Sequence, residues 1–329
     1  MNPSYPDLDL NLAPTIHIGV CLLTYKRPEL LKVALQSVVA QNVAQSLRLF
    51  RVGNDCLLSR AVMHILVVDN DSAESGRAVF DQVCGTQSVS AHYVCEAKRG
   101  LSAARNRALS ESASMDFVAF LDDDEAAHPA WLTNLLRGSA TYNAAVVTGP
   151  VFPRHEHTNT WVTRGGFFDE EQRNTGETVR FVATNNVLLR SDIVTAFRFS
   201  NRFDATGGED TEYFMRIQRA GHRMIWVNEA VVSESIPPSR ANARWLLNRA
   251  HSDANRYTHS CLSFDSGPRT VIPRLITAIG GALAGVALLP LSVLGRRYAI
   301  RALRLISRAA GTLSALRGES ESYYTLKHD

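Results

Sequence analysis

Short apolar segments alternate with amphipathic ones along the first two thirds of the chain. Strand-like segments occupy residues 16–23, 65–68, 91–95, 117–121, 144–147, 187–190 and 224–227. Between them, apolar residues recur at helical spacing over residues 28–38, 74–83, 101–111, 129–139 and 210–220. Strands that alternate with helices indicate βαβ units. The pattern therefore predicts an α/β fold with a mainly parallel sheet that helices cover on both faces.

The last third of the chain has a different pattern. Residues 275–295 contain no charge and are just long enough to span a bilayer as a helix, although four glycines and Pro290 interrupt them. The next stretch has an apolar stripe beside a row of arginines. These arginines share one helical face and are Arg297, Arg301, Arg304 and Arg308. A cationic amphipathic helix next to a glycine-rich apolar one favours an interfacial or re-entrant membrane anchor. The alternative is a buried helical hairpin or a dimer interface.

The charge distribution supports this division. The net charge is +3, but the segment from Arg240 to Gly318 holds twelve arginines, no lysine and two aspartates, so the preceding residues are net acidic. We expect these arginines to face solvent at an anionic membrane surface. Nucleic-acid binding is disfavoured, because their neighbours are aliphatic residues and glycine rather than base-stacking aromatics. The expected units are a tail at 1–14, a domain at 15–240, a helical membrane-associating region at 241–318 and a tail at 319–329.

The cysteines and the N-terminus indicate the cellular compartment in which the protein acts. Five scattered cysteines without CxxC spacing predict neither a disulfide framework nor a zinc site, and they favour a reducing environment. Residues 1–14 lack the basic and apolar segments of a secretory signal. We therefore expect the chain to act on the cytoplasmic side of a membrane.

An acidic run ends one of the predicted strands. Residues 117–121 are apolar, and Asp122, Asp123, Asp124 and Glu125 follow directly. Ligands of open α/β sheets bind outside the carboxyl ends of the strands. Four carboxylates there repel one another unless a cation offsets their charge, and hard divalent ions prefer oxygen ligands. A metal site is one interpretation, and an aspartate that caps the next helix is the other.

Polar residues also end two other predicted strands, at Thr24-Tyr25 and at Asp69. Right-handed crossovers bring the carboxyl ends of parallel strands to one edge of the sheet. Together with the acidic run, these residues describe a cleft with an aromatic ring, an isolated carboxylate and a metal-binding cluster. Such a cleft suits a nucleotide whose base stacks on the ring and whose diphosphate binds the metal.

Five motifs occur in an order that is typical of a known family. They are Thr24-Tyr25-Lys26-Arg27-Pro28, Val67-Val68-Asp69-Asn70, Arg99-Gly100-Leu101-Ser102-Ala103-Ala104-Arg105-Asn106, Phe120-Leu121-Asp122-Asp123-Asp124 and Gly208-Glu209-Asp210. Over residues 15–240 the chain resembles family 2 inverting glycosyltransferases, which implies the nucleotide-diphospho-sugar-binding fold called GT-A. Residues 234–240 and 245–249, with the arginine-rich tail, are similar to bacterial exopolysaccharide glucosyltransferases of the succinoglycan type.

The resemblance implies a role for each donor-site residue. Tyr25 would line the base pocket, and Asp69 would accept the N3 hydrogen of uracil. Asp122 would contact the ribose and join Asp124 on Mn²⁺ or Mg²⁺, which would bridge the diphosphate. Asp123 could share either role. The metal would neutralise the charge that develops on the departing nucleoside diphosphate.

Further residues join this set, some with alternatives that the sequence leaves open. Thr24 and Arg27 belong to the donor site. Arg99 and Arg105 are candidates for phosphate or base contacts, but for Arg105 a structural salt bridge explains the residue equally well. Glu234 stands where many relatives carry a histidine metal ligand. It is either an oxygen ligand or an outward surface residue.

The family places its general base in a Glu-Asp pair at the start of a helix, which corresponds to Glu209 and Asp210. Direct displacement at the anomeric carbon requires a base for the acceptor hydroxyl on the face opposite the leaving group, and one displacement inverts the configuration. Helix capping by an acidic residue is the competing explanation. Gly207 and Gly208, which would let the backbone approach a ligand closely, favour the catalytic role.

These features predict a metal-dependent inverting glycosyltransferase at the cytoplasmic face of the inner membrane. It would move a hexose, glucose from UDP-glucose by resemblance, onto a lipid-linked oligosaccharide for a surface polysaccharide. A sugar-phosphate nucleotidyltransferase would need a glycine-rich loop after the first strand, and residues 24–28 contain no glycine. The other alternative is a non-catalytic membrane-associated scaffold subunit, against which the intact Asp122, Asp124 and Asp210 argue. Residues 153–180 are polar and aromatic and form either a lid, an acceptor platform or a surface excursion.

Overall fold

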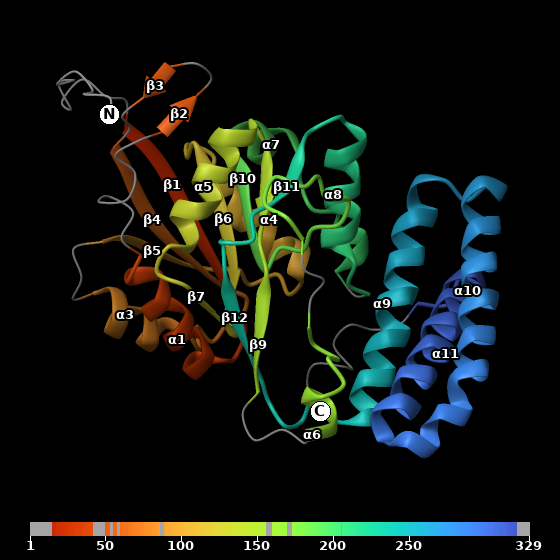
Figure 1. The fold of residues 1–329 in the computed structure, drawn as a ribbon. Helices are drawn as coiled ribbons and strands as arrows, with labels where there is room; N and C mark the ends of the chain where they lie inside the picture. Colours follow the sequence, from red (N-terminus) through yellow and green to blue (C-terminus); the bar gives the residue numbers. More distant parts are fainter. Residues whose placement is uncertain are drawn as a thin grey trace, which may run out of the picture.

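A seven-stranded sheet forms the centre of the molecule, and long C-terminal helices stand beside it (Figure 1). The computed structural model describes residues 15–41, 50–52, 55–57, 60–85, 89–155, 160–169, 173–204 and 206–320. The predicted tail at residues 1–14 and most of the predicted tail at 319–329 lie outside the described residues.

The central sheet has the strand order β11-β8-β10-β6-β1-β4-β5. The strands are β1 (Thr15–Thr24), β4 (Arg60–Asp69), β5 (Ser90–Cys95), β6 (Phe117–Asp122), β8 (Val146–Thr148), β10 (Asn186–Arg190) and β11 (Met224–Trp226). β1 pairs in parallel with β4 and β6, as do β4 with β5 and β8 with β11. Only β10 is antiparallel to its neighbours among these pairs. The predicted mainly parallel sheet is confirmed, with one reversed strand.

Alternating side chains of the sheet build two layers of core. On β1, Ile18, Val20 and Leu22 belong to one buried cluster and Cys21 to the other. The first layer lies under α1 (Pro28–Val39), α3 (Arg77–Cys84) and α5 (Trp131–Tyr142). The second lies under α4 (Leu101–Glu111), α7 (Ser191–Ala196) and α8 (Glu209–Arg219). Helices therefore cover both faces, as the sequence predicts.

A smaller three-stranded sheet extends from the carboxyl end of β6. β7 (Glu125–Ala127) follows the acidic turn and pairs antiparallel with β12 (Val232–Ile236), which pairs in parallel with β9 (Val151–His155). Glu234 is thereby paired with Glu125. This sheet brings Glu234 next to the acidic run, more than 100 residues away in the sequence. The short elements are β2 (Phe50–Val52), β3 (Asp55–Leu57), α6 (Thr160–Thr163) and η1 (Asn201–Phe203).

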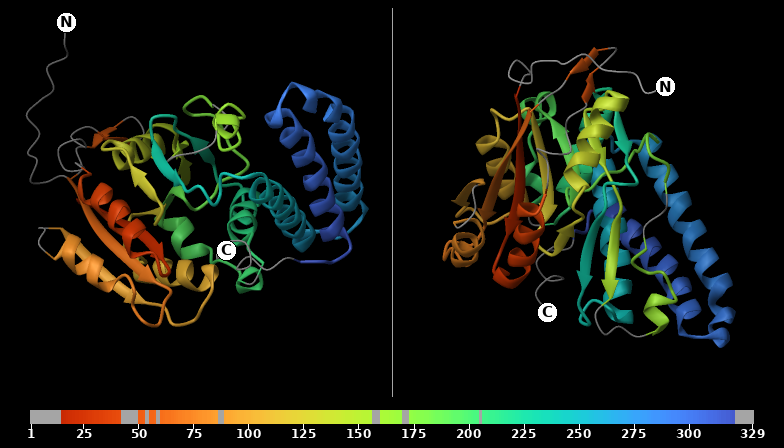
Figure 2. Two further views of the ribbon diagram at one scale, coloured as in Figure 1. Left: turned by 90° about the horizontal axis from the view of Figure 1, so that it is seen from below. Right: turned by 60° about the vertical axis from the view of Figure 1, so that its left-hand side comes forward.

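The C-terminal region is helical, as predicted. Its elements are α9 (Ala243–Phe264), α10 (Pro268–Leu288), the 3-10 helix η2 (Leu289–Leu294) and α11 (Arg296–Leu316). The carbonyl oxygen of the Asn242 side chain caps α9 by accepting from the Trp245 backbone N–H at 2.9 Å. α11 packs against both α9 and α10, and α10 lies at the outer edge of the molecule (Figures 1 and 2). A Cβ on Gly285 would lie 2.7 Å from Ile306 Cγ1, so this glycine allows α10 and α11 to approach closely.

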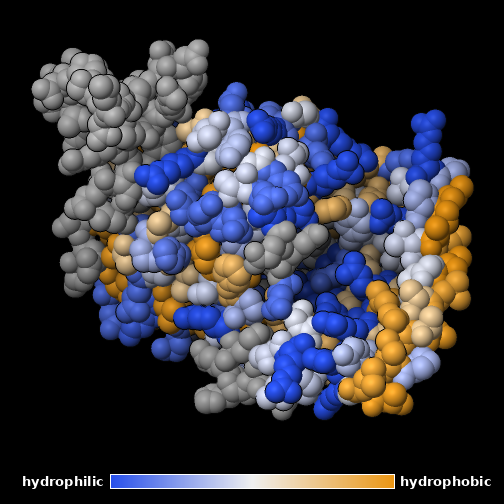
Figure 3. Space-filling model, viewed as in Figure 1, coloured by the Kyte–Doolittle hydropathy of each residue, from blue (hydrophilic) through white to orange (hydrophobic). Residues whose placement is uncertain are grey.

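The outer side of α10 and η2 is an exposed apolar surface. Its largest exposed side chains are Ile272, Ile276, Ile279, Leu283, Val286, Val293 and Leu294. Residues Pro268–Leu294 are long and apolar enough to cross a membrane, and most of them are not buried within the protein. Hydrophobic residues run along this edge in Figure 3. The surface fits the predicted membrane-associating segment, because soluble proteins seldom expose so continuous an apolar patch.

The arginines near α11 do not all face solvent. Arg301 donates to the backbone oxygen of Gly165 at 2.8 Å. The guanidinium of Arg304 lies 5.3 Å from the ring centre of Phe167, and that of Arg296 lies 4.7 Å from the ring of Trp161. Arg296 and Arg301 are nevertheless exposed, as the sequence predicts, and of the three Arg304 alone is partly buried, so the prediction fails for Arg304. Aromatic rings and a carbonyl within the protein are their partners.

Candidate functional site

A cavity of about 470 Å³ opens where the carboxyl end of β6 meets the C-terminal helices. The β6–β7 turn, the start of α8, β12, α9 and α11 contribute to its walls. The charged residues that line it are Arg105, Asp122, Asp124, Glu125, Glu209, Asp210, Glu234, Arg240, Arg249, Asp253, Arg256 and Arg304. Hydrophilic residues line the hollow between the main body and the C-terminal helices in Figure 3. The structure thus gathers six of the predicted charged site residues in one place.

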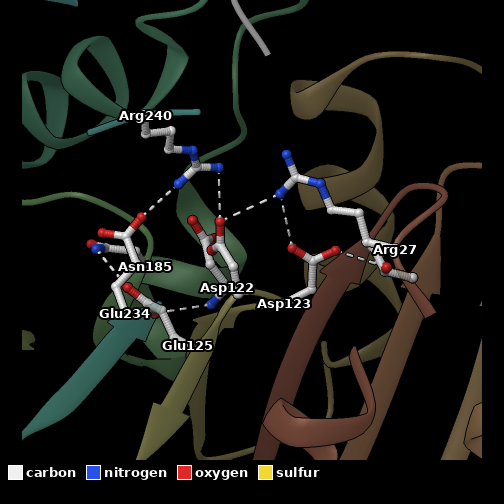
Figure 4. A network of polar contacts seen from close by, with 9 residues as sticks. Arg27, Asp122, Asp123, Glu125, Asn185, Glu234 and Arg240 are labelled. Atoms are coloured by element: carbon white, nitrogen blue, oxygen red, sulfur yellow. Dashed lines mark hydrogen bonds and ion pairs between the residues drawn. The ribbon is translucent and has the colours of Figure 1, made fainter. Parts of the chain in front are cut away.

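Asp123 joins the ends of β1 and β6. Thr24 Oγ1 donates to Asp123 Oδ2 at 2.8 Å, and Arg27 Nη1 lies 3.5 Å from Asp123 Oδ1 (Figure 4). The Asp123 side chain is buried. Three residues that the sequence assigns to the donor site therefore contact one another, and their first role in the fold is to fix the acidic turn.

Asp124 lies between two arginines. Its Oδ2 is 3.4 Å from Arg27 Nη1 and 3.1 Å from Arg240 Nη2. Arg240 also donates through Nη1 to Glu234 Oε1 at 2.8 Å (Figure 4). Asp122, Asp124 and Glu234, the three predicted metal ligands, all line the cavity. Glu234 therefore faces the site, and the outward-surface alternative is wrong.

Glu125 supports the acidic turn from below. It is buried, and its two carboxylate oxygens accept from Asn185 Nδ2 at 2.9 Å and from the Asp122 backbone N–H at 3.2 Å. Burial raises its pKa well above the usual range, and the charges of Asp122 and Asp124 add to this effect. Burial thus favours the neutral form of Glu125, which supports the backbone of the turn.

The same two causes act on other carboxyl groups of the site. Burial raises the pKa of Asp123 to about 7, with a further rise from Asp124 that Arg27 and Thr24 oppose. Burial also raises the pKa of Glu234 to about 7, where Asp124 adds to the rise and Arg240 opposes it. The carboxyl groups together resist full ionisation. An additional cation would relieve that resistance.

The residues fit a divalent ion that shares its ligands with a phosphate group. Within the described residues, no three His, Cys, Asp or Glu side chains are arranged to hold an ion by themselves. Mg²⁺ usually binds one or two protein carboxylates and completes its shell with substrate phosphates and water, and Mn²⁺ prefers similar oxygen ligands. Asp122 and Asp124 supply two carboxylates at the cavity.

Asp69 has a structural role at the end of β4. It is fully buried and accepts from the backbone N–H groups of Asp71 at 2.9 Å and Gly76 at 2.8 Å, and from the Tyr93 hydroxyl at 2.5 Å. Both of its carboxylate oxygens are engaged in this way. These hydrogen bonds give Asp69 a structural role, and its contact with uracil stays a prediction, because Oδ1 accepts one of the three and a carboxylate can accept about four.

Tyr25 and Arg99 form a pair at the edge of the sheet. The Arg99 guanidinium lies 5.1 Å from the centre of the Tyr25 ring. Asn70 holds the intervening loop, since its side chain donates to the Glu96 oxygen at 2.7 Å and accepts from the Gly100 N–H at 2.9 Å. The pair lies outside the strand ends, where a planar base could stack. The roles of Tyr25 and Arg99 in donor binding stay predictions.

Arg105 and Glu209 form a buried, hydrogen-bonded ion pair that joins α4 to the start of α8. The second carboxylate oxygen of Glu209 has no hydrogen-bond partner among the described residues. Burial raises the pKa of Glu209, Arg105 opposes the rise, and the charge of Asp210 adds to it. This geometry favours the structural salt bridge over a phosphate contact for Arg105.

Asp210 lines the cavity from the first turn of α8. Its Oδ1 accepts from the Thr211 backbone N–H at 2.6 Å. The preceding Gly207 and Gly208 have φ angles of +73° and +93°, which favour glycine. A Cβ on Gly208 would lie 3.2 Å from Arg256 Cβ. The positive φ angles and, at Gly208, the approach of α9 account for glycine here, and the closer approach of a ligand stays a prediction.

Several cavity residues are absent from the predicted site. Arg240 was part of a motif but had no assigned contact, and only the pairing of β7 with β12 brings it to Asp124. Arg249, Arg256 and Arg304 were interpreted as membrane-facing cations, yet they line the cavity. The helical spacing of Arg304 within its row of arginines is visible in the sequence, but no local pattern distinguishes a face that meets lipid from one that meets another domain.

The fold and the cavity define a class of protein. A mainly parallel sheet with one reversed strand, an acidic turn after β6 and a Glu-Asp pair at the start of a helix constitute a GT-A nucleotide-sugar transferase fold. Residues 19–199 match the family model of glycosyl transferase family 2, and residues 117–313 match that of glycosyl transferase family group 2. The chain is 32% identical over 316 residues to the succinoglycan biosynthesis protein ExoM of Rhizobium meliloti, which covers 93% of this chain and 95% of that protein. The chain therefore belongs to glycosyl transferase family 2.

Two solved structures share the fold. The mannosyltransferase PcManGT from Pyrobaculum calidifontis, in complex with GDP-Man and Mn²⁺, is 17% identical, with a TM-score of 0.63 and coverage of 95% of this chain and 90% of that one. Residues 1–349 of S. aureus TarS, in complex with UDP, are 13% identical, with a TM-score of 0.51 and coverage of 92% of both chains. The GT-A fold extends over most of each chain.

Proposed function

We propose that this enzyme is a metal-dependent, inverting hexosyltransferase that acts at a membrane. The observation that carries the proposal is the meeting of Asp122 and Asp124, from the end of β6, with Asp210, from the start of α8, around one cavity. A single displacement needs a cation at the leaving group and a base near the attacking hydroxyl. The cavity offers carboxylates for both.

The donor side is formed by the acidic turn. Asp122 and Asp124 would hold Mn²⁺ or Mg²⁺ together with the diphosphate of the donor, and the ion would stabilise the charge of the departing nucleoside diphosphate. Arg27 and Arg240 orient Asp124 through the contacts at 3.4 and 3.1 Å. Glu234 would become available as a further oxygen ligand of the ion if Arg240 moved away from it.

The acceptor side is formed around Asp210. Because Oδ1 accepts from the Thr211 N–H, we assign Oδ2 as the atom that takes the proton of the acceptor hydroxyl. The hydroxyl oxygen forms the new bond to the anomeric carbon as the bond to the diphosphate breaks. An α-linked donor would then yield a β-glycoside.

The relatives support the proposed donor and product. ExoM is named for succinoglycan biosynthesis, TarS is solved with UDP, and PcManGT with GDP-Man and Mn²⁺. We infer UDP-glucose as the donor and a bacterial exopolysaccharide precursor as the product. A lipid-linked oligosaccharide is the acceptor that suits an enzyme with an exposed apolar face.

The apolar surface of α10 and η2 would lie along the cytoplasmic face of the inner membrane. α10 packs on α11, which carries Arg297, Arg301, Arg304 and Arg308. Were α10 to cross the bilayer, α11 would have to follow or separate from it, and an arginine at the bilayer centre costs about 3 kcal/mol by insertion scales. An orientation with the outer side of α10 in the lipid interface avoids that cost.

The test is turnover of a panel of UDP-, GDP- and dTDP-sugars with Mn²⁺ or with EDTA, with a membrane lipid extract as acceptor. We expect one UDP-sugar to be consumed, with transfer to lipid, only when the metal is present. Failure to bind or turn over any donor, with the protein folded and Mn²⁺ present, would contradict the proposal. That result would favour the non-catalytic scaffold instead.

A further inference from the structure

The C-terminal helices present a basic wall to the cavity. Arg249, Asp253 and Arg256 of α9 line the cavity and share one helical face, because they are four and three residues apart. Arg304 of α11 lines it beside them. Among the described residues of these two helices, the charged groups in the cavity lining are three guanidinium groups and one carboxylate.

The α9 part of the wall is held in place by hydrogen bonds. Arg249 Nε donates to Asp253 Oδ2 at 2.9 Å, and Arg256 Nη1 lies 3.7 Å from Asp253 Oδ1. Arg256 Nε also donates to the backbone oxygen of Thr206 at 2.9 Å, just before the turn that leads into α8. Arg256, whose side chain is 11% exposed, is therefore oriented in advance of any ligand, whereas Arg249 pairs with Asp253 at the open side of the wall, where the two side chains are 51% and 45% exposed.

Arg304 is a cation in unfavourable surroundings. It is half-buried, and its guanidinium lies 5.3 Å from the Phe167 ring. Burial lowers its pKa, as do the charges of Arg308 and Arg301, while Asp253 opposes the effect. An anion bound beside Arg304 would relieve this repulsion.

The wall lies on the acceptor side of the cavity. α9 packs against the start of α8, since Ser260 Oγ of α9 donates to the backbone oxygen of Gly208 at 3.2 Å, and Asp210 follows two residues later. The acidic turn of β6 already has Arg27, Arg240 and the expected metal for the donor diphosphate. α11, which carries Arg304, packs on α10. The opposite side of α10 is the exposed apolar surface. An anion at the wall would therefore belong to the molecule that arrives from the membrane.

We propose that Arg249, Arg256 and Arg304 form an acceptor subsite for an anionic group that lies close to the reacting hydroxyl. Guanidinium groups bind phosphate and carboxylate through paired, charge-assisted hydrogen bonds. The anion is either the phosphate at the lipid end of a short acceptor glycan or the carboxylate of an acidic sugar within that glycan. The inference rests on the proposed function, because the anion is part of the acceptor in that transfer.

The test is equilibrium binding to the full-length protein in EDTA, which removes the metal that the donor end requires. The probes are a short-chain alkyl glucosyl phosphate, the matching alkyl glucuronide and the neutral alkyl glucoside. We expect at least one charged probe to bind about tenfold tighter than the neutral one, and which of the two does so identifies the source of the anion.

Substitutions test which side chains cause the preference for the charged probe. Arg304→Gln and Arg249→Gln should each weaken the charged probe about tenfold and leave the neutral probe unchanged. Arg304→Lys should retain part of the effect, because it keeps the charge but loses the paired geometry. Asp253→Asn should strengthen binding of the charged probe, which a folding defect would not do. Arg308→Gln is the matched control, since Arg308 is exposed on the same helix outside the cavity lining.

Two results would overturn the subsite. One is equal binding of charged and neutral probes by the wild type. The other is a drop in UDP affinity, measured with Mn²⁺, that is as large in Arg304→Gln as the drop in affinity for the charged probe. That result would assign the wall to the donor. Both results are independent of turnover, so failure of the subsite and failure of the proposed transferase activity are distinguishable.

Discussion

Neighbouring carboxylates of the acidic run have different surroundings and different tasks. Asp123 is buried against Thr24, Glu125 is buried beneath the turn, and Asp122 and Asp124 face the cavity. The order of residues located the run and predicted a metal site there. It did not separate these tasks, because they depend on Arg240 and Asn185, which the fold brings in from beyond residue 180.

The buried pair of Arg105 and Glu209 should be important for stability. Arg105→Ala leaves a buried carboxylate without its cation, and we expect a loss of about 3 kcal/mol in the free energy of unfolding. Arg107→Ala on the same helix is the control, since its pair with Glu111 is exposed and should cost under about 1 kcal/mol. Denaturant unfolding compares the two. Equal losses in the free energy of unfolding would show that the buried pair stabilises the fold no more than the exposed pair does.

Asp210→Asn should separate catalysis from donor binding. The amide keeps the size of the side chain but cannot take the proton of the acceptor hydroxyl, so transfer should fall at least about 100-fold. UDP-sugar affinity should stay within about twofold, because the proposed donor site is at the acidic turn. Initial rates and calorimetry measure the two quantities. Transfer at the wild-type rate would exclude Asp210 as the base.

The raised carboxyl pKa values predict a pH dependence of metal binding. Because folding raises the pKa values of Asp123 and Glu234 to about 7, the folded state retains protons that the unfolded state loses above about pH 4. Ionisation therefore reduces the stability of the metal-free protein as the pH rises from about 4 to 7. Mn²⁺ should raise the melting temperature more at pH 8 than at pH 6, where it competes with protons. An equal or larger shift at pH 6 would contradict this account.

At the scale of elements, periodicity located most of the sheet and its helices. β1, α1, α4 and β6 begin and end within two residues of the predicted bounds, because each combines an apolar pattern with a clear boundary. The reversed direction of β10 was not visible, since a short apolar run reads the same in either direction. The β7–β12–β9 sheet depends on long-range pairing, which local pattern does not encode.

α10 and η2 should attach the protein to lipid. Ile276 and Leu283 are 65% and 66% exposed. The double substitution Ile276→Asp with Leu283→Asp should reduce sedimentation with anionic lipid vesicles at least about tenfold, because each apolar side chain contributes roughly 1.5–3 kcal/mol on burial. Val33→Asp, on an exposed position of α1, is the control and should leave vesicle binding unchanged. Undiminished binding of the double variant would place the lipid contact elsewhere.

At the scale of the whole molecule, the cavity joins two parts that the sequence pattern separates. The α/β domain supplies the acidic turn and Asp210, and the C-terminal helices supply the opposite wall and the apolar surface. The boundary near residue 240 is therefore not a boundary of function. An enzyme built in this way would bring a soluble donor and a membrane-held acceptor to the same cavity.

The central claim is that Asp122 and Asp124 bind a nucleotide diphosphate through a divalent ion. The most direct measurement is calorimetric titration of UDP into the full chain with Mn²⁺ or with EDTA, for the wild type, Asp124→Ala and the surface control Asp81→Ala. We predict that the UDP affinity measured with Mn²⁺ falls at least about tenfold when EDTA replaces the metal, and also in Asp124→Ala. Asp81→Ala should bind UDP as tightly as the wild type. UDP binding of equal strength with and without metal, or in Asp124→Ala, would contradict the account.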